Sequence, residues 1–128
     1  MPTRLKMKTT GKRGDGVLVA GAVQRIAEFW DLTNERLGQI LGLSGSTVSR
    51  LRSGSWHFQS GTKSFELAQY LMRLFRSLDS LMGSDDVAAR SWLANENLEL
   101  GGKPIDLIRT IRGLSDVADY VDDYRARV

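Results

Sequence analysis

The apolar residues of this chain are spaced as in α-helices along most of its length. From Val17 to Trp30 they recur at steps of three or four residues, which is the pattern of a helix with one buried face. The same spacing returns over the short segment 34–41 and over 65–82, which is long enough for about five turns. No segment alternates apolar and polar residues as a half-buried strand does. We therefore predict an all-α fold.

Helix-capping residues mark the ends of two short helices in the first half of the chain. Thr33 precedes segment 34–41 and Gly42 follows it, a pairing typical of a helix start and a helix stop. Ser44 can cap a second helix that ends at Gly54. We therefore expect two short helices joined by a tight turn, followed by a polar loop and the long helix.

Shorter helices are predicted in the second half from residues that start or stop helices. Ser84 is expected to cap the first, with Asp85 and Asp86 in its first turn, where the helix dipole favours negative charge. Pro104 suits the first turn of the next helix, which is predicted to run through Ile111. The remaining signals are Gly113 as a helix break and Ser115 as the cap of the last helix.

Charged residues are unevenly distributed along the chain, whose formal net charge is +3. Residues 1–16 hold five basic residues and one acidic residue and lack apolar periodicity, so we expect a flexible basic arm. Residues 79–128 hold ten acidic and six basic residues. Such asymmetry is consistent with two partners of opposite charge, and equally with a solvated surface that has a charged tail.

The residue types present exclude several classes of function. The chain has no cysteine, which excludes disulfides, thiolate metal sites and cysteine nucleophiles and fits the reducing cytoplasm. It has one histidine, His57, and no nucleophile–base arrangement, so we expect no catalytic residue, no metal and no cofactor. No apolar run reaches the roughly 18 residues that a membrane span needs. We therefore expect a cytoplasmic protein without membrane contact that is not an enzyme, and a small hydrolase is the alternative from another class.

Residues 32–54, LTNERLGQILGLSGSTVSRLRSG, carry the most informative pattern. Gly38 provides a small residue where two helices cross, and Gly42 can adopt the left-handed conformation that a turn of three or four residues requires. Apolar residues at five positions can form the core between the helices: Leu37, Leu41, Leu43, Val48 and Leu51. The segment resembles the helix-turn-helix of the Xre and phage-repressor class. A plain helical hairpin is the alternative, but an outer face rich in serine and arginine is not typical of one.

The resemblance implies that the second helix of the motif lies in the DNA major groove, with its first residues at base edges. We assign base contacts to Ser46, Ser49 and Arg50, and Arg50 can bind guanine through two hydrogen bonds. Phosphate contacts orient a protein on DNA without reading its sequence. They are assigned to Thr33, Asn34, Arg52 and Lys63, and Ser44 completes the predicted DNA-contact residues.

A second resemblance covers the end of the chain. The segment SWLANENLELGGKPIDLI, residues 91–108, is followed by Gly113 and by apolar residues between Val117 and Val121. This order of a Trp-Leu helix, a Leu-Gly-Gly loop, a proline and a final helix resembles the toxin-binding domain of the MbcA/ParS/Xre antitoxins. The loop is one residue shorter than the commonest form, and Glu96-Asn97 stands where the family often has proline.

This resemblance implies a partner protein, a RES-domain toxin that consumes NAD and is usually encoded beside the antitoxin. It also implies that the chain is not an enzyme, that it covers the entrance of the toxin's active site and that it represses the shared promoter. The candidate toxin contacts are Asp106, Arg109, Asp122, Asp123, Tyr124, Arg125, Arg127 and Val128. Because Val121 is the last position of the buried stripe, we expect residues 122–128 to add little to the core apart from Tyr124.

These observations divide the chain into four parts: a flexible arm (1–16), a helix-turn-helix domain (17–63), a connecting and dimerisation helix (64–83) and a toxin-binding domain (84–128). The long helix has apolar residues on more than one side, which suggests a homodimer. One alternative is a stand-alone repressor of the phage type, whose second half serves only dimerisation. Another is a toxin-binding protein that no longer binds DNA, since residues 31–63 hold only four basic residues against two acidic ones.

Overall fold

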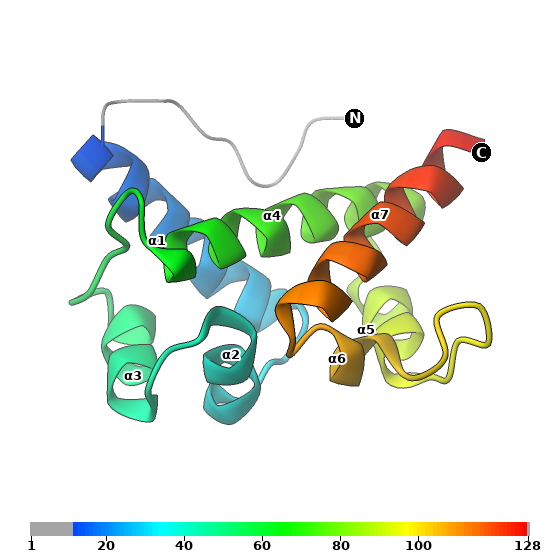
Figure 1. Ribbon diagram of the computed structural model, residues 1–128, viewed down its shortest axis with the longest axis horizontal. Coiled ribbons are helices and arrows are strands. Elements are labelled where there is room, and N and C mark those ends of the chain that lie inside the picture. The colour runs from blue at the N-terminus through cyan, green and yellow to red at the C-terminus, as the bar shows by residue number, and fades with distance from the viewer. Residues whose placement is uncertain (1–11, 128) are drawn as a thin grey trace.

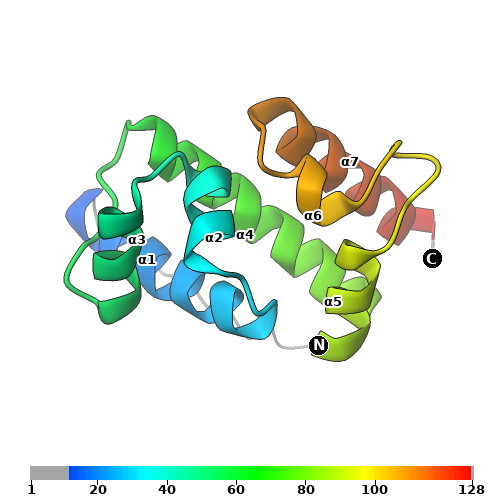
Figure 2. The ribbon, with the colours of Figure 1, turned by 90° about the horizontal axis from the view of Figure 1, so that it is seen from below.

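The computed structural model describes residues 12–127, which form seven helices and no strand. The helices are α1 (Lys12–Phe29), α2 (Asn34–Leu41), α3 (Gly45–Ser53), α4 (Lys63–Leu81), α5 (Asp86–Ala94), α6 (Pro104–Leu107) and α7 (Ile111–Arg127). Figures 1 and 2 show α1, α2 and α3 gathered at one end of α4 and α5, α6 and α7 towards the other. None of these helices is long and apolar enough to cross a bilayer. The predicted all-α fold is confirmed.

The long helix α4 holds the two ends of the molecule together, because both bury apolar residues against it. It packs most extensively against α7 and α1 and also contacts α2 and α5. Its buried apolar residues are Phe65, Ala68, Leu71, Met72, Leu74, Phe75 and Leu78. The Phe75 ring stacks on Phe29 and tilts against Trp30, at 5.5 Å between ring centroids in each case. The described residues therefore share one continuous core.

The predicted ends of α2 and α3 are confirmed, together with the residues that cap them. The side chains of Thr33 and Ser44 each accept a hydrogen bond from the backbone N–H three residues later. Gly42 and Gly54 follow the two helices with φ of 68° and 85°. These are left-handed conformations that glycine adopts without the clash a Cβ would cause.

The first helix begins at Lys12, five residues before the predicted start at Val17. The end of the predicted flexible arm, residues 12–16, is therefore helical. Gly16 is buried because the loop before α4 lies directly against it: a Cβ on Gly16 would come 1.9 Å from the Phe58 carbonyl oxygen. A contact between residues so distant in sequence leaves no local signal. Residues 1–11 of the predicted arm lie outside the described residues.

The cap of α5 is Asp85 and not the predicted Ser84. The Asp85 side chain accepts a hydrogen bond from the Ala88 N–H at 3.0 Å. Ser84 instead has a φ of 61°, and its hydroxyl donates to the Asp79 carboxylate at 3.1 Å. Serine and aspartate are equally common caps, so the residue types alone do not distinguish between two neighbours.

The last two helices also have ends other than those predicted. α6 ends at Leu107, and Ile111 begins α7 instead of ending α6. Thr110 caps α7, since its Oγ1 accepts the Gly113 N–H at 3.0 Å, and so Ser115 is not the cap. Gly113 does not break a helix but lies in the first turn of α7, where a Cβ would come 1.8 Å from the Leu107 carbonyl oxygen.

Candidate nucleic-acid and protein interfaces

The hairpin of α2 and α3 depends on a glycine where the two helices meet. Gly38 is buried, and a Cβ there would lie 2.8 Å from the Leu43 carbonyl oxygen and 3.4 Å from Val48 Cγ2. A larger residue would push the helices apart. The predicted core of the hairpin is confirmed: Leu37, Leu41, Val48 and Leu51 are fully buried and Leu43 is half-buried.

The outer face of α3 is polar and open to solvent. Its predicted base contacts, Ser46, Ser49 and Arg50, are all exposed, and their spacing of three and four residues places them on one side of the helix. Arg50 Nη2 donates to Thr47 Oγ1 at 3.3 Å, but a guanidinium has five N–H donors and keeps others available. Asn34, the first residue of α2, is exposed as well. This surface can offer both donors and acceptors to a polar partner.

The other predicted DNA contacts have structural roles or lie outside the hairpin. Thr33 and Ser44 use their side-chain oxygens as helix caps. Arg52 Nη1 donates to the Leu32 carbonyl oxygen at 2.9 Å, which ties α3 to the segment before α2. Lys63 is the first residue of α4 and lines a groove between α4 and α7 instead of the hairpin.

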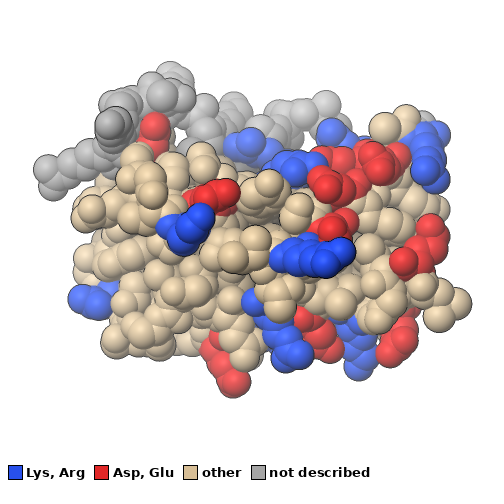
Figure 3. Space-filling view, viewed as in Figure 1, with Lys and Arg blue, Asp and Glu red and all other residues tan. Residues whose placement is uncertain are grey.

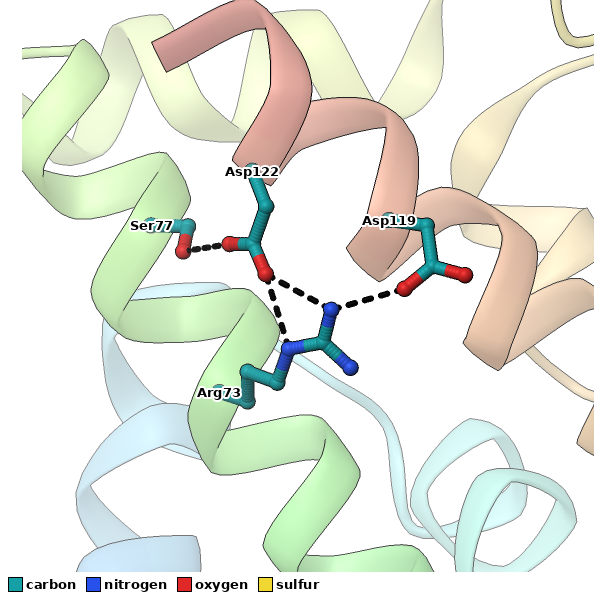
Figure 4. Close-up of polar contacts among 4 residues, drawn as sticks. All are labelled: Arg73, Ser77, Asp119 and Asp122. Atoms are coloured by element: carbon teal, nitrogen blue, oxygen red, sulfur yellow. Dashed lines mark hydrogen bonds and ion pairs between the residues drawn. The ribbon is translucent and has the colours of Figure 1, made fainter. Parts of the chain in front are cut away.

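One predicted toxin contact, Asp122, forms hydrogen bonds and an ion pair within the molecule. Figure 4 shows its carboxylate between two side chains of α4, Arg73 and Ser77. Arg73 Nε donates to Asp122 Oδ2 at 2.8 Å, and Arg73 Nη2 lies 2.7 Å from oxygens of both Asp119 and Asp122. The hydroxyl of Ser77, which is 4% exposed, donates to the other Asp122 oxygen. This cluster joins α7 to α4, so the expectation that residues from Asp122 onward add little to the packing was wrong for Asp122.

The cluster also shifts the pKa values of two of its members, Asp122 and Arg73. Burial would raise the pKa of Asp122, but the hydrogen bonds from Ser77 and Arg73 and the charge of Arg73 outweigh it and lower that pKa below its ordinary value of 3.8. Hydrogen bonds to Asp119 and Asp122 raise the pKa of Arg73. Asp122 is therefore an anion at neutral pH. Arg73 and Ser77 stand four residues apart on α4, and this spacing is the one sequence signal that could have indicated a shared partner.

A second predicted toxin contact, Asp106, connects the two ends of the molecule. Arg36 of α2 donates to Asp106 Oδ1 at 3.1 Å and to the Ile105 carbonyl oxygen at 3.4 Å. Nearby, Arg90 of α5 donates to the carbonyl oxygen of Phe29, the last residue of α1, at 2.8 Å. The roles of Arg36 and Arg90 were not predicted from the sequence, because their partners are distant along the chain.

The remaining predicted toxin contacts are free of such cross-links and exposed. Arg109 lies in the turn before α7, and three charged residues occupy the last turns of that helix: Asp123, Arg125 and Arg127. Tyr124 is 46% exposed, with its ring 6.1 Å from that of Tyr120. Figure 3 shows charged side chains of both signs crowded near this end of α7. Val128 lies outside the described residues.

Two protein-family models match successive parts of the chain. Residues 12–73 match the antitoxin Xre-like helix-turn-helix domain, and residues 77–127 match the antitoxin Xre/MbcA/ParS C-terminal toxin-binding domain. The first match runs from the start of α1 into α4, and the second from the end of α4 through α7. No curated protein matches the chain. Among residues 12–127, no group of three or more histidine, cysteine, aspartate and glutamate side chains could hold a metal ion. Both resemblances are thereby confirmed, and the chain belongs to the Xre-type antitoxins, with a helix-turn-helix domain followed by a toxin-binding domain.

Proposed function

We propose that this antitoxin binds and inhibits a RES-domain toxin that degrades NAD, and that it represses the promoter of its own operon. The observation that supports the proposal is that α4 packs against helices of both matched domains and so joins two different exposed surfaces. The exposed Ser46, Ser49 and Arg50 face belongs to the helix-turn-helix, while the exposed end of α7 belongs to the toxin-binding domain. The antitoxin acts by binding, needs no cofactor and is not an enzyme.

On DNA, α3 enters the major groove. Arg50 forms two hydrogen bonds with a guanine, while Ser46 and Ser49 contact neighbouring base edges. Asn34 and Arg52 contact phosphates on either side. The bond from Arg52 to the Leu32 carbonyl oxygen leaves its other guanidinium N–H groups for the DNA. Thr33 and Ser44 act indirectly, since as caps they hold the N-terminal ends of α2 and α3 towards the phosphates.

Helix-turn-helix repressors of this class bind operators as dimers, with one recognition helix in each half-site, so we propose a second copy of this chain as a partner. A groove of about 440 Å³ lies between α4 and α7. We name it the α4–α7 groove, and its lining residues are Lys63, Glu66, Leu67, Tyr70, Ile111, Arg112, Ser115 and Asp116. The lining combines apolar residues, among them Ile111 at 67% exposed, with two positive and two negative side chains. A self-complementary surface of this kind suits a two-fold symmetric dimer.

The proposal is tested by producing the chain together with the RES-domain protein encoded beside its gene, and by fusing the operon's promoter to a reporter. We expect the two proteins to purify as one complex and the reporter to be silenced. A complex without silencing would favour a toxin-binding protein that has lost DNA binding. Silencing without a complex would favour the stand-alone repressor, and either result would contradict the proposal as stated.

A further inference from the structure

A row of aromatic side chains lines a second groove, at the other end of α7. The rings of Trp92 from α5 and Tyr120 from α7 are stacked at 6.4 Å between centroids, and Tyr124 continues the row 6.1 Å from Tyr120. With Met82 and Glu99 these residues line a cavity of about 310 Å³. We name it the aromatic groove. All its lining residues fall within the segment that matches the toxin-binding domain.

The charged residues that line the aromatic groove and the depression beside it are all acidic. Glu99 lines the groove, and Glu96 lines a depression of about 380 Å³ that shares Met82 and Trp92 with it. The residues that line these two depressions include no lysine, arginine or histidine. Aromatic rings beside carboxylates attract a guanidinium or an ammonium group, through the ring quadrupole and through direct charge. The aromatic groove therefore has the chemistry of a site for a cationic side chain.

The loop that carries Glu99 is held in place before any partner arrives. Figures 1 and 2 show the segment between α5 and α6 projecting from the body of the molecule. Asn97 fastens it, because its Oδ1 accepts the Leu100 N–H at 3.0 Å and its backbone pairs with Gly102. The Tyr120 hydroxyl donates to Glu99 Oε1 at 3.2 Å. Leu98, at the tip, is 93% exposed. A fixed carboxylate next to an exposed apolar side chain can bind a partner at little entropic cost.

We propose that the aromatic groove binds a lysine- or arginine-bearing segment of the toxin, with Glu99 pairing the cation over the rings of Trp92, Tyr120 and Tyr124. This inference rests on the proposed function, which supplies the toxin as partner. The charges of the lining residues favour the toxin as occupant over a second copy of the chain. The lining of the α4–α7 groove includes charges of both signs, which suits self-association. The only charged residue that lines the aromatic groove is the acidic Glu99. The apolar Leu98 contacts the surface of the toxin beside that segment.

The test compares Glu99→Lys with the matched control Glu28→Lys. Glu28 is an exposed glutamate on α1, in the other domain, so the control has the same change of charge. Each full-length variant is titrated with the purified RES-domain protein, and separately with a synthetic peptide of alternating glycine and arginine. Glu99→Lys should weaken binding of the toxin about tenfold or more, and Glu28→Lys should leave it unchanged. Tyr124→Leu, which keeps an apolar side chain but removes the ring face, should weaken it several-fold.

The outcomes separate this inference from the function on which it rests. If the toxin binds the wild-type chain and all three variants equally, the groove is not the contact, although the antitoxin function stands. If the toxin does not bind the wild-type chain, the proposed function fails. The peptide then decides the chemistry of the groove: selective loss in Glu99→Lys supports a cation site, and equal binding to both glutamate variants overturns it. A change of oligomeric state in Glu99→Lys alone would identify a second copy as the occupant and overturn the inference.

Discussion

Arg50 is the residue on which the proposed reading of DNA sequence depends most. Arg50→Ala should weaken operator binding by about 1–3 kcal/mol and relax specificity at one base pair, because a bidentate contact to guanine is lost. Arg76→Ala, which removes an exposed arginine from α4, is the control for loss of charge and should have little effect. Titration of operator variants checks both. Operator binding unchanged by Arg50→Ala would mean that another face of α3 meets the DNA.

Replacing glycine by alanine should have different effects on stability at Gly113 and at Gly45, because the surroundings of the added methyl group differ. Gly113→Ala should lower the free energy of unfolding by about 1–3 kcal/mol, because its Cβ would come 1.8 Å from the Leu107 carbonyl oxygen. Gly45→Ala meets no atom within 4 Å and should be neutral or stabilising, since alanine favours a helix. Denaturant unfolding of the two variants gives the comparison. Equal stability would show that the turn between α6 and α7 relaxes freely.

At the scale of the element, α7 forms ion pairs with Arg73 of α4 through Asp119 and Asp122. The packing of α7 on α4 should therefore weaken at acidic pH. The pKa of Asp122 is lowered from 3.8, so its contribution to stability is present above that value and is lost as the pH falls through the lower native pKa. Asp122→Asn should cost about 1 kcal/mol at neutral pH and flatten the acid limb of the stability curve.

The neighbouring Asp123→Asn is the matched control, because Asp123 is exposed. Thermal unfolding between neutral and strongly acidic pH measures both variants. If Asp122→Asn and Asp123→Asn give the same acid limb, then the Arg73 cluster contributes nothing to the docking of α7.

The last residues of α7 follow Asp122 and so lie beyond the ion pairs with Arg73. A chain that ends after Asp122 should keep its fold and its affinity for DNA but lose the ability to neutralise the toxin. It loses Tyr124 and three charged side chains that are exposed in the free protein, Asp123, Arg125 and Arg127. Circular dichroism and DNA titration check the first part, and survival of cells that produce the toxin checks the second. Full protection by the shortened chain would move the essential contact to the segment 101–109.

Sequence reasoning succeeded where the cause of the structure is local. The ends of α2 and α3 were predictable because Thr33, Gly42 and Ser44 act on residues within one turn of themselves. It failed where two neighbouring residues were equally good caps, as at Ser84 and Asp85, and where the packing of a residue does not follow from its type. Gly113 resembled a helix break, yet it is needed where α7 begins directly against the backbone before it.

The candidate toxin-binding residues divide in the same way. Those predicted on the exposed end of α7 are exposed, because the apolar stripe that precedes them ends at Val121. Asp122 and Asp106 resembled surface charges, but their partners are Arg73 and Arg36, 49 and 70 residues away. No periodicity in the sequence connects such pairs.

At the scale of the whole molecule, the proposed DNA-binding and toxin-binding surfaces are joined by contacts that cross between its two ends. Besides the shared α4, the ion pair of Arg36 with Asp106 and the bond from Arg90 to Phe29 cross between the two ends. We expect the assembled antitoxin to be a dimer through the α4–α7 groove. Ile111→Glu, which places a charge among the apolar residues that line that groove, should convert the dimer to a monomer and weaken operator binding. Sedimentation measures the change, and a dimer unaffected by Ile111→Glu would exclude this groove as the interface.

As the proposed antitoxin, this chain protects cells from a toxin that consumes NAD. Protection is measured most directly as the cellular NAD concentration after induction of the RES-domain protein encoded beside the gene, with and without the chain. NAD should collapse when the toxin is produced alone and stay at its normal level when the full-length chain is produced with it. An equal loss of NAD in both cultures, at equal protein levels, would show that the chain does not inhibit the toxin.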